Sequence, residues 1–195
     1  MARTQLNSNP RTTTYTTSAD FCRIFKEDMK DLHLLALLLT ADPAKAEQVF
    51  VSGLDDCATG NGVFKEWAGS WARRSIIRNA VRLVAPQPRD TNRAQAAAGD
   101  PAWPVLPAEV SALFELQSFE RFAFVMSVLE GYSDQDCALL LGCTRQTLIA
   151  ARVRALQQVV RSRELRGRSQ TTAATLHPNN SIIELALPKR LATPA

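Results

Sequence analysis

Apolar side chains recur at helical spacing through most of the first half of the chain. Over residues 20–40 they fall three or four positions apart, which predicts one long amphipathic helix. Asp42 and Pro43 are typical of an N-cap followed by a proline at the first helical position, so a second helix is expected to start there. After the turn TGNG, a third helix is predicted over residues 63–84. Together these helices predict a small three-helix bundle.

The helical pattern stops in the middle of the chain. Residues 85–107 hold five prolines and several alanines without any periodicity, which indicates a linker. We therefore expect an all-α protein made of two small helical domains, a three-helix bundle over 19–84 and a helix-turn-helix over 108–166, joined by this Pro/Ala-rich linker. The polar N-terminal arm, 1–18, is expected to be disordered, and the tail, 167–195, to be flexible.

A glycine-containing turn joins two short predicted helices in the stretch EGYSDQDCALLLGCTRQTLIAARVRAL, residues 130–156. Ser133 is a favourable N-cap, and Asp136 stands three residues later, where a capping-box partner belongs. Gly142 can adopt the left-handed conformation that closes a helix, and Thr144 is a suitable N-cap for the next one. Two helices joined in this way are typical of a helix-turn-helix motif.

The helix after this turn has an apolar and a polar side. Its predicted inward stripe is Leu148, Ala151, Ala155 and Val159. Its predicted outward residues are Gln146, Ala150, Val153 and Gln157. A recognition helix inserts its first residues into the major groove, and Arg145 and Gln146 carry side chains that can bond to base edges. A helical hairpin with a solvated basic face is the alternative, and we favour DNA binding over it. The candidate DNA-binding residues are Thr144, Arg145, Gln146, Ile149, Arg152 and Arg154.

One side of the predicted third helix combines aromatic and basic side chains. Its members are Phe64, Trp67, Trp71, Arg74, Arg78 and Arg82. Aromatic rings among arginines suit single-stranded DNA, because an unstacked base can stack on a ring while the cations hold the backbone. In the alternative interpretation the tryptophans belong to the core and the arginines form a solvated face. We take Trp67, Arg74 and Arg78 as the candidates for contact with DNA on this helix.

Composition narrows the function classes. A net charge of +4 and a pI near 9.1 permit a nucleic-acid partner. The four cysteines form no CxxC pair and have no histidine at zinc spacing, so no metal and no cofactor are expected. No catalytic motif is present, so we do not expect an enzyme. No apolar run approaches the ~20 residues that cross a bilayer, and the N-terminus does not resemble a secretion signal, so a cytoplasmic protein without a membrane partner is expected.

The helix-turn-helix stretch, extended to residues 119–156, resembles the promoter-binding fourth region of bacterial sigma factors of the extracytoplasmic-function type. The resemblance lies in EGYS, in LGC and in the closing RA of the last helix, after a helix that contains Arg121. The first half is similar to the family's second region, through LLALLLTADP and the Trp-containing helix with IIRNAVRLV. If the resemblance holds, the partners are double-stranded promoter DNA, core RNA polymerase and an anti-sigma protein. The polymerase-binding candidates that it implies are Asp42, Glu47 and Gln48.

Two other functions remain open. The chain could be a helix-turn-helix regulator that no longer engages polymerase, or an interaction module that sequesters a partner such as an anti-sigma protein. The tail holds one apolar island, SIIELAL at 181–187, which could pack back on a domain or bind a partner. A folded-back tail is the favoured interpretation of this island.

Overall fold

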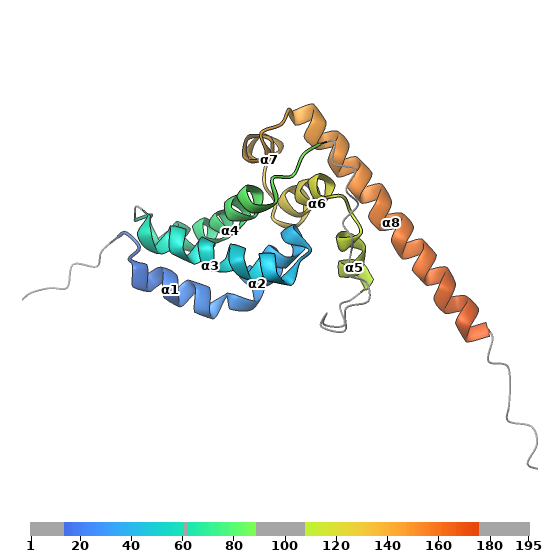
Figure 1. The fold of residues 1–195 in the computed structure, drawn as a ribbon, viewed down its shortest axis with the longest axis horizontal. Helices are drawn as coiled ribbons and strands as arrows, with labels where there is room; N and C mark the ends of the chain where they lie inside the picture. The colour runs from blue at the N-terminus through green and yellow to red at the C-terminus, as the bar shows by residue number, and fades with distance from the viewer. Residues whose placement is uncertain (1–13, 61, 89–107, 176–195) are drawn as a thin grey trace, which may run out of the picture.

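The computed structural model describes residues 14–60, 62–88 and 108–175, and within these ranges the chain is helical (Figure 1). The prediction of an all-α protein is confirmed. A single antiparallel β-bridge, between Tyr15 and Phe64, is the β-type pairing found among the described residues. Most of the predicted linker and the apolar island of the tail lie outside the described ranges.

Four helices form the first block, residues 14–84. They are α1 (Ser18–Glu27), α2 (Met29–Thr40), α3 (Pro43–Thr59) and α4 (Ala68–Val84). The single helix predicted for residues 20–40 is interrupted at Asp28, where φ is −97° and ψ is 19°, so that prediction is wrong. Phe21 on α1 and Leu32 on α2 are nevertheless both buried, because the break bends the chain around the core and keeps the helical spacing of the apolar residues.

Helices α3 and α4 pack closely against each other. The Asp42 side chain caps α3 by accepting a backbone N–H of the first turn at 3.1 Å. A Cβ atom on Gly53 would lie 2.8 Å from the Ile76 side chain, so the glycine permits the close approach of the two helices. The Ser75 hydroxyl donates to the Gly53 carbonyl at 3.1 Å across the same contact. This packing fixes the direction in which the opposite side of α4 faces.

The residues just before α1 pair with the segment that leads into α4. The Thr16 N–H donates to the Val63 carbonyl at 2.7 Å, and the Thr16 hydroxyl donates to the same oxygen at 2.5 Å. The Tyr15 ring stacks on Phe64 with centroids 4.8 Å apart. Residues 14–17, placed in the predicted disordered arm, are therefore tied to the first block, whereas residues 1–13 lie outside the described ranges. A 3₁₀ turn, η1 (Lys65–Trp67), follows, so α4 begins later than predicted.

The second block, residues 108–175, holds the remaining elements. They are α5 (Ala108–Phe114), α6 (Ser118–Phe124), the π-helical segment η2 (Val125–Leu129), α7 (Asp134–Leu141) and α8 (Arg145–Thr175). Helix α8 extends well past the body of the molecule (Figure 1) and continues beyond residue 166, where the tail was predicted to start. Among the described helices, none has both the length and the apolar composition needed to span a membrane.

The two blocks share one hydrophobic core. Helix α2 contacts α5 and α6, and α4 contacts α7. Arg121 of α6 is buried, and its guanidinium donates to the carbonyls of Leu39 and Thr40 at 3.1 and 3.4 Å and to that of Leu116 at 3.1 Å. Leu39 and Thr40 end α2, where backbone carbonyls lack helical partners and a cation is favourable. The division into two domains joined by a linker is compatible with this packing and stays a prediction.

Candidate nucleic-acid interface

The turn between α7 and α8 has the local geometry that the sequence predicted. The Ser133 hydroxyl accepts the Asp136 N–H at 3.1 Å at the start of α7. Gly142 ends α7 with φ of 62°, in the left-handed region. The Thr144 hydroxyl accepts the Thr147 N–H at 3.1 Å at the start of α8. Because both caps and the glycine lie where predicted, the helix-turn-helix geometry follows from local sequence.

Helix α8 turns the predicted side toward the core. Leu148, Ala151 and Ala155 are fully buried, and Val159 is half-buried. The predicted outward residues Gln146, Ala150, Val153 and Gln157 are all exposed. The first turns of α8 therefore present Gln146 and its outward neighbours to solvent, as a groove-reading helix requires.

The arginines of α8 differ in how freely they can reach a ligand. Arg145 is exposed, and its Nε lies 3.8 Å from an Asp134 carboxylate oxygen. Arg152 donates to the same carboxylate at 2.5 Å, and Arg154 donates to the nearly buried Glu120 at 2.7 Å. These carboxylate partners were not predicted from the sequence. Arg152 and Arg154 are therefore partly neutralised within the chain, and Arg145 is the freest of the three.

A hollow of 540 Å³ lies beside the start of α8. It is lined by Thr144, Gln146 and Arg154 together with Pro88, a residue of the predicted linker. Ile149 lies on the adjacent exposed surface. The structure thus brings the candidate residues at the start of α8 to one continuous surface, and the described end of the linker reaches its edge.

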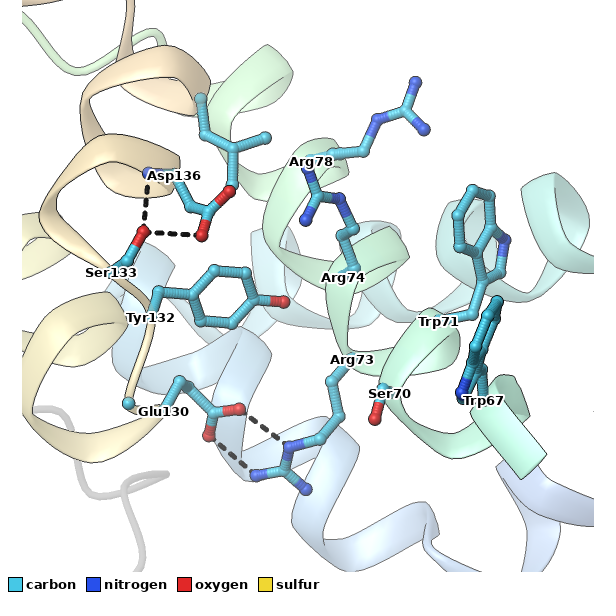
Figure 2. Close-up of a pocket in the computed structure, with 12 residues that line it drawn as sticks. Trp67, Ser70, Trp71, Arg73, Arg74, Arg78, Glu130, Tyr132, Ser133 and Asp136 are labelled. Atoms are coloured by element: carbon cyan, nitrogen blue, oxygen red, sulfur yellow. Dashed lines mark hydrogen bonds and ion pairs between the residues drawn. The ribbon is translucent and has the colours of Figure 1, made fainter.

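A second surface of interest is a groove of about 890 Å³ between α4 and the α7 side of the second block (Figure 2). From α4 and the preceding turn it is lined by Trp67, Ser70, Trp71, Arg73, Arg74 and Arg78. From the second block it is lined by Glu130, Gly131, Tyr132, Ser133, Asp136 and Leu140. Trp67 and Trp71 are 60% and 39% exposed, so the interpretation of these two residues as core tryptophans is wrong.

Charges in this groove are partly balanced. Glu130 accepts both Nε and a terminal nitrogen of Arg73, at 2.7 and 2.6 Å, and the pKa of Arg73 is raised chiefly by this hydrogen bond (Figure 2). Figure 2 shows Arg74 on the Tyr132 side of the groove and Arg78 farther along α4. No ion pair to a described carboxylate is found for either of these two arginines. They are the cations of the groove that remain available to an anionic ligand.

Tyr132 supplies the hydroxyl on the far wall of the groove. Burial raises the pKa of Tyr132, so its hydroxyl stays protonated at neutral pH and can act as a hydrogen-bond donor. Exposed indoles, two available guanidiniums and a phenol provide stacking surfaces beside cations. This combination can hold an unstacked nucleobase together with its phosphate.

The polymerase-binding candidates lie at and near the start of α3. Asp42 is engaged as the helix cap, and its carboxylate also lies 3.9 Å from the Lys45 amine. Glu47 and Gln48 are exposed on the helix surface. Gln48 borders a hollow of 240 Å³ that is also lined by Arg82 of α4. The three candidates therefore lie within two turns of one helix. Glu47 and Gln48 are accessible to a partner, whereas Asp42 serves as the helix cap.

Two of the four cysteines pack as small apolar side chains. Cys57 and Cys137 are buried, and burial raises the pKa of both thiols, that of Cys137 to about 11. In the described part of the chain, no group of three or more His, Cys, Asp or Glu side chains is arranged to hold a metal ion.

No protein-family model matches the chain, and a search of curated proteins finds no significant match.

Proposed function

We propose that this protein is a sigma-like transcription initiation factor of the cytoplasm that binds promoter DNA through α7 and α8 and directs core RNA polymerase to it. The resemblance of its motifs to the fourth and second regions of extracytoplasmic-function sigma factors supports this class of protein. In this proposal α8 enters the major groove of an upstream promoter element. The aromatic and basic side of α4 holds the single strand of the opened promoter, and the protein needs no catalytic residue of its own.

The observation that carries the proposal is the exposure of Arg145 and Gln146 immediately after a capped, glycine-closed turn. The opposite side of the same helix is buried, so its orientation is fixed by packing. A fixed helix whose first turn exposes an arginine and a glutamine is suited to bond the edges of guanine and adenine.

Internal pairing of the arginines changes how such a helix would bind. Arg152 and Arg154 already contact carboxylates, and therefore attract phosphates less strongly than free arginines would. Each phosphate neutralised adds about 0.9 to the slope of log affinity against log salt. We therefore expect a shallow salt dependence on duplex DNA, with base contacts supplying much of the preference.

Substitution of the first turn tests the DNA-reading role. Arg145→Ala combined with Gln146→Ala should relax sequence preference in footprinting on a promoter library. The matched control is Arg161→Ala, farther along α8 and also exposed, which should weaken binding evenly across sequences. Unchanged footprints in the double variant would remove α8 as the recognition helix.

A separate measurement tests promoter opening. Trp67→Ala and Arg78→Ala should lower permanganate reactivity of the melted segment while circular dichroism stays unchanged, because both side chains are exposed on α4 or the turn before it. Normal reactivity in both variants would exclude this surface from strand separation.

The second candidate function is a DNA-binding regulator that does not engage polymerase. It is favoured by Asp42, whose carboxylate caps α3 and leaves Glu47 and Gln48 as the accessible polymerase-binding candidates. Retention of the protein on purified core RNA polymerase separates the two functions. Retention that is lost in Glu47→Ala with Gln48→Ala supports the initiation factor, whereas no retention at modest salt supports the regulator. An anti-sigma partner would be sought by the same retention assay.

A further inference from the structure

Helix α8 carries a second apolar face that nothing in the described residues covers. We call it the outer stripe, and its members are Ile149, Val153, Leu156 and Val160, which are 37%, 45%, 41% and 53% exposed. They are spaced by four, three and four residues, so they lie on one side of the helix, apart from the side that packs on the core. The stripe is about 16 Å long at 1.5 Å per helical residue.

Exposed contiguous apolar side chains on a helix usually mark a contact surface. Duplex DNA accounts for only part of this one, because a recognition helix reads the groove with its N-terminal residues. Leu156 and Val160 lie three to four turns beyond the start of α8. A further occupant is therefore needed to cover the whole stripe.

The apolar island of the tail, residues 181–187, has a matching pattern. In an extended segment alternate side chains point the same way, so Ile183, Leu185 and Leu187 would share one face. Pro188 follows directly and limits how far such a segment can continue. The island therefore offers three apolar side chains in a row to a surface of corresponding length.

The length of the connection allows the island to reach the stripe. From the end of α8 at Thr175, Val160 is about 22 Å and Ile149 about 39 Å back along the helix. An extended chain of about 3.3 Å per residue carries Ile183 about 26 Å and Leu187 about 40 Å from Thr175. If the tail runs back antiparallel to α8, Ile183 lies level with the stretch between Leu156 and Val160, and Leu187 lies level with Ile149.

We propose that residues 183–187 of the chain's own tail dock, extended and antiparallel, on the outer stripe of α8. A tethered segment has an effective concentration near the millimolar range, so a small contact is sufficient to hold it. A second copy of the chain is a poorer occupant, because the stripe exposes an area on the order of 300 Å², well below half of a stable interface of about 1,600 Å².

Docking has a consequence for DNA binding, and this consequence, unlike the docking itself, rests on the proposed function. Ile149 belongs both to the outer stripe and to the candidate DNA-binding residues. The docked tail and duplex DNA would therefore compete for the start of α8, and the tail would reduce the affinity for DNA.

Disulfide trapping tests the docking without DNA. In a chain with the exposed Cys22 replaced by serine, Val153→Cys and Leu185→Cys are combined and mildly oxidised at low protein concentration. The matched control pairs Leu185→Cys with Val51→Cys on α3, a valine that is 51% exposed. We expect the α8 pair to close within one chain about tenfold faster than the control pair, as a bound tail has a higher local concentration.

Two outcomes would overturn the docking. One is equal closure rates for the α8 pair and the control pair. The other is a disulfide that forms between chains at a rate that rises with concentration, which would assign the stripe to a second copy. Ile183→Asp with Leu187→Asp provides the reverse test, since it should slow the α8 pair to the rate of the control pair.

Truncation tests the consequence for DNA. A chain that ends at residue 176 should bind promoter duplex about tenfold more tightly than the full chain if the tail is docked nine-tenths of the time. A chain that ends at residue 188 keeps the island and should bind as the full chain does. Rapid trapping with unchanged affinity would keep the docking and overturn the competition, whereas failed trapping overturns the docking whatever the affinities are.

Discussion

Replacement of Arg121 by alanine should destabilise the whole molecule, because this side chain joins α6 to the end of α2. Its guanidinium donates to three backbone carbonyls, those of Leu39, Thr40 and Leu116, and is buried. No carboxylate is paired with Arg121 in the described part of the chain. The cost of burying the cation is therefore offset by these hydrogen bonds and not by an ion pair.

The magnitude follows from these two opposing terms. Hydrogen bonds that involve a charged donor contribute about 1.5–3 kcal/mol each, so three of them supply roughly 4–9 kcal/mol. Burial lowers the pKa of Arg121 to about 10, and a shift of that size corresponds to a cost of about 3 kcal/mol. The hydrogen bonds outweigh the burial cost, and we expect Arg121→Ala to lower the free energy of unfolding by about 1–6 kcal/mol.

Urea unfolding followed by circular dichroism at pH 7 measures this loss. Arg121→Met keeps most of the side-chain volume and removes the donors, so it should lose most of the same stability as alanine. Arg23→Ala is the control, because Arg23 is exposed and lies 3.6 Å from Asp20 in a solvent-screened surface pair, so its loss should change the stability little. A methionine variant as stable as the parent would refute the reasoning, since burial of the cation would then cancel its hydrogen bonds.

The pH dependence of this loss has a definite sign. Because folding lowers the pKa of Arg121 to about 10, the folded state binds fewer protons than the unfolded state above pH 10. The unfavourable contribution of burying the cation therefore becomes smaller as the pH rises above 10. Between pH 7 and 9 Arg121 is protonated in both states. The difference between the parent and Arg121→Met should therefore be flat over that interval.

Three further predictions concern the second block and its contact with α4. A double-mutant cycle on Arg73→Ala and Glu130→Gln should give a coupling free energy of about 1 kcal/mol in urea unfolding. The value is modest because the contact is bidentate but Arg73 is partly exposed, and zero coupling would contradict the contact. Gly142→Ala should lower the free energy of unfolding by about 1 kcal/mol, because an alanine is strained at a φ of 62° although nothing lies within 4 Å of its Cβ atom. An unchanged stability would contradict this backbone strain. A thiol reagent at pH 8 should label exposed Cys22 and spare Cys137, whose pKa of about 11 keeps the buried thiol protonated, as mass spectrometry of native and urea-treated protein would show.

Local features of the candidate interface could be predicted from sequence because they depend on neighbouring residues. The caps at Ser133 and Thr144 and the left-handed Gly142 each involve groups within three residues, and all three are found. The buried side of α8 follows from apolar spacing alone, as Leu148 illustrates. The exposure of Trp67 could not be predicted in this way, since a tryptophan on an amphipathic helix suits either a core or a surface.

Long-range contacts were beyond the pattern of the sequence. Arg121 was identified only as part of a motif, and its contact with carbonyls 82 and 81 residues away depends on how the blocks pack. The pairing of Arg154 with Glu120, 34 residues apart, is of the same kind. The break at Asp28 could not be predicted for another reason: two helices that meet at a bend keep the same spacing of apolar residues as one straight helix.

The pairing of Thr16 with Val63 matters for anyone who shortens or tags this protein at its N-terminus. Tyr15 stacks on Phe64, and Phe64 meets the Trp67 ring edge-on at 5.3 Å, so three rings in contact connect the residues before the first helix to the groove. Proteolytic trimming up to Ser18, or a bulky tag fused there, would remove the first of these rings and free the second. The fluorescence of the Trp67 indole would then change, although the ring that packs against it is Phe64 and not the trimmed Tyr15.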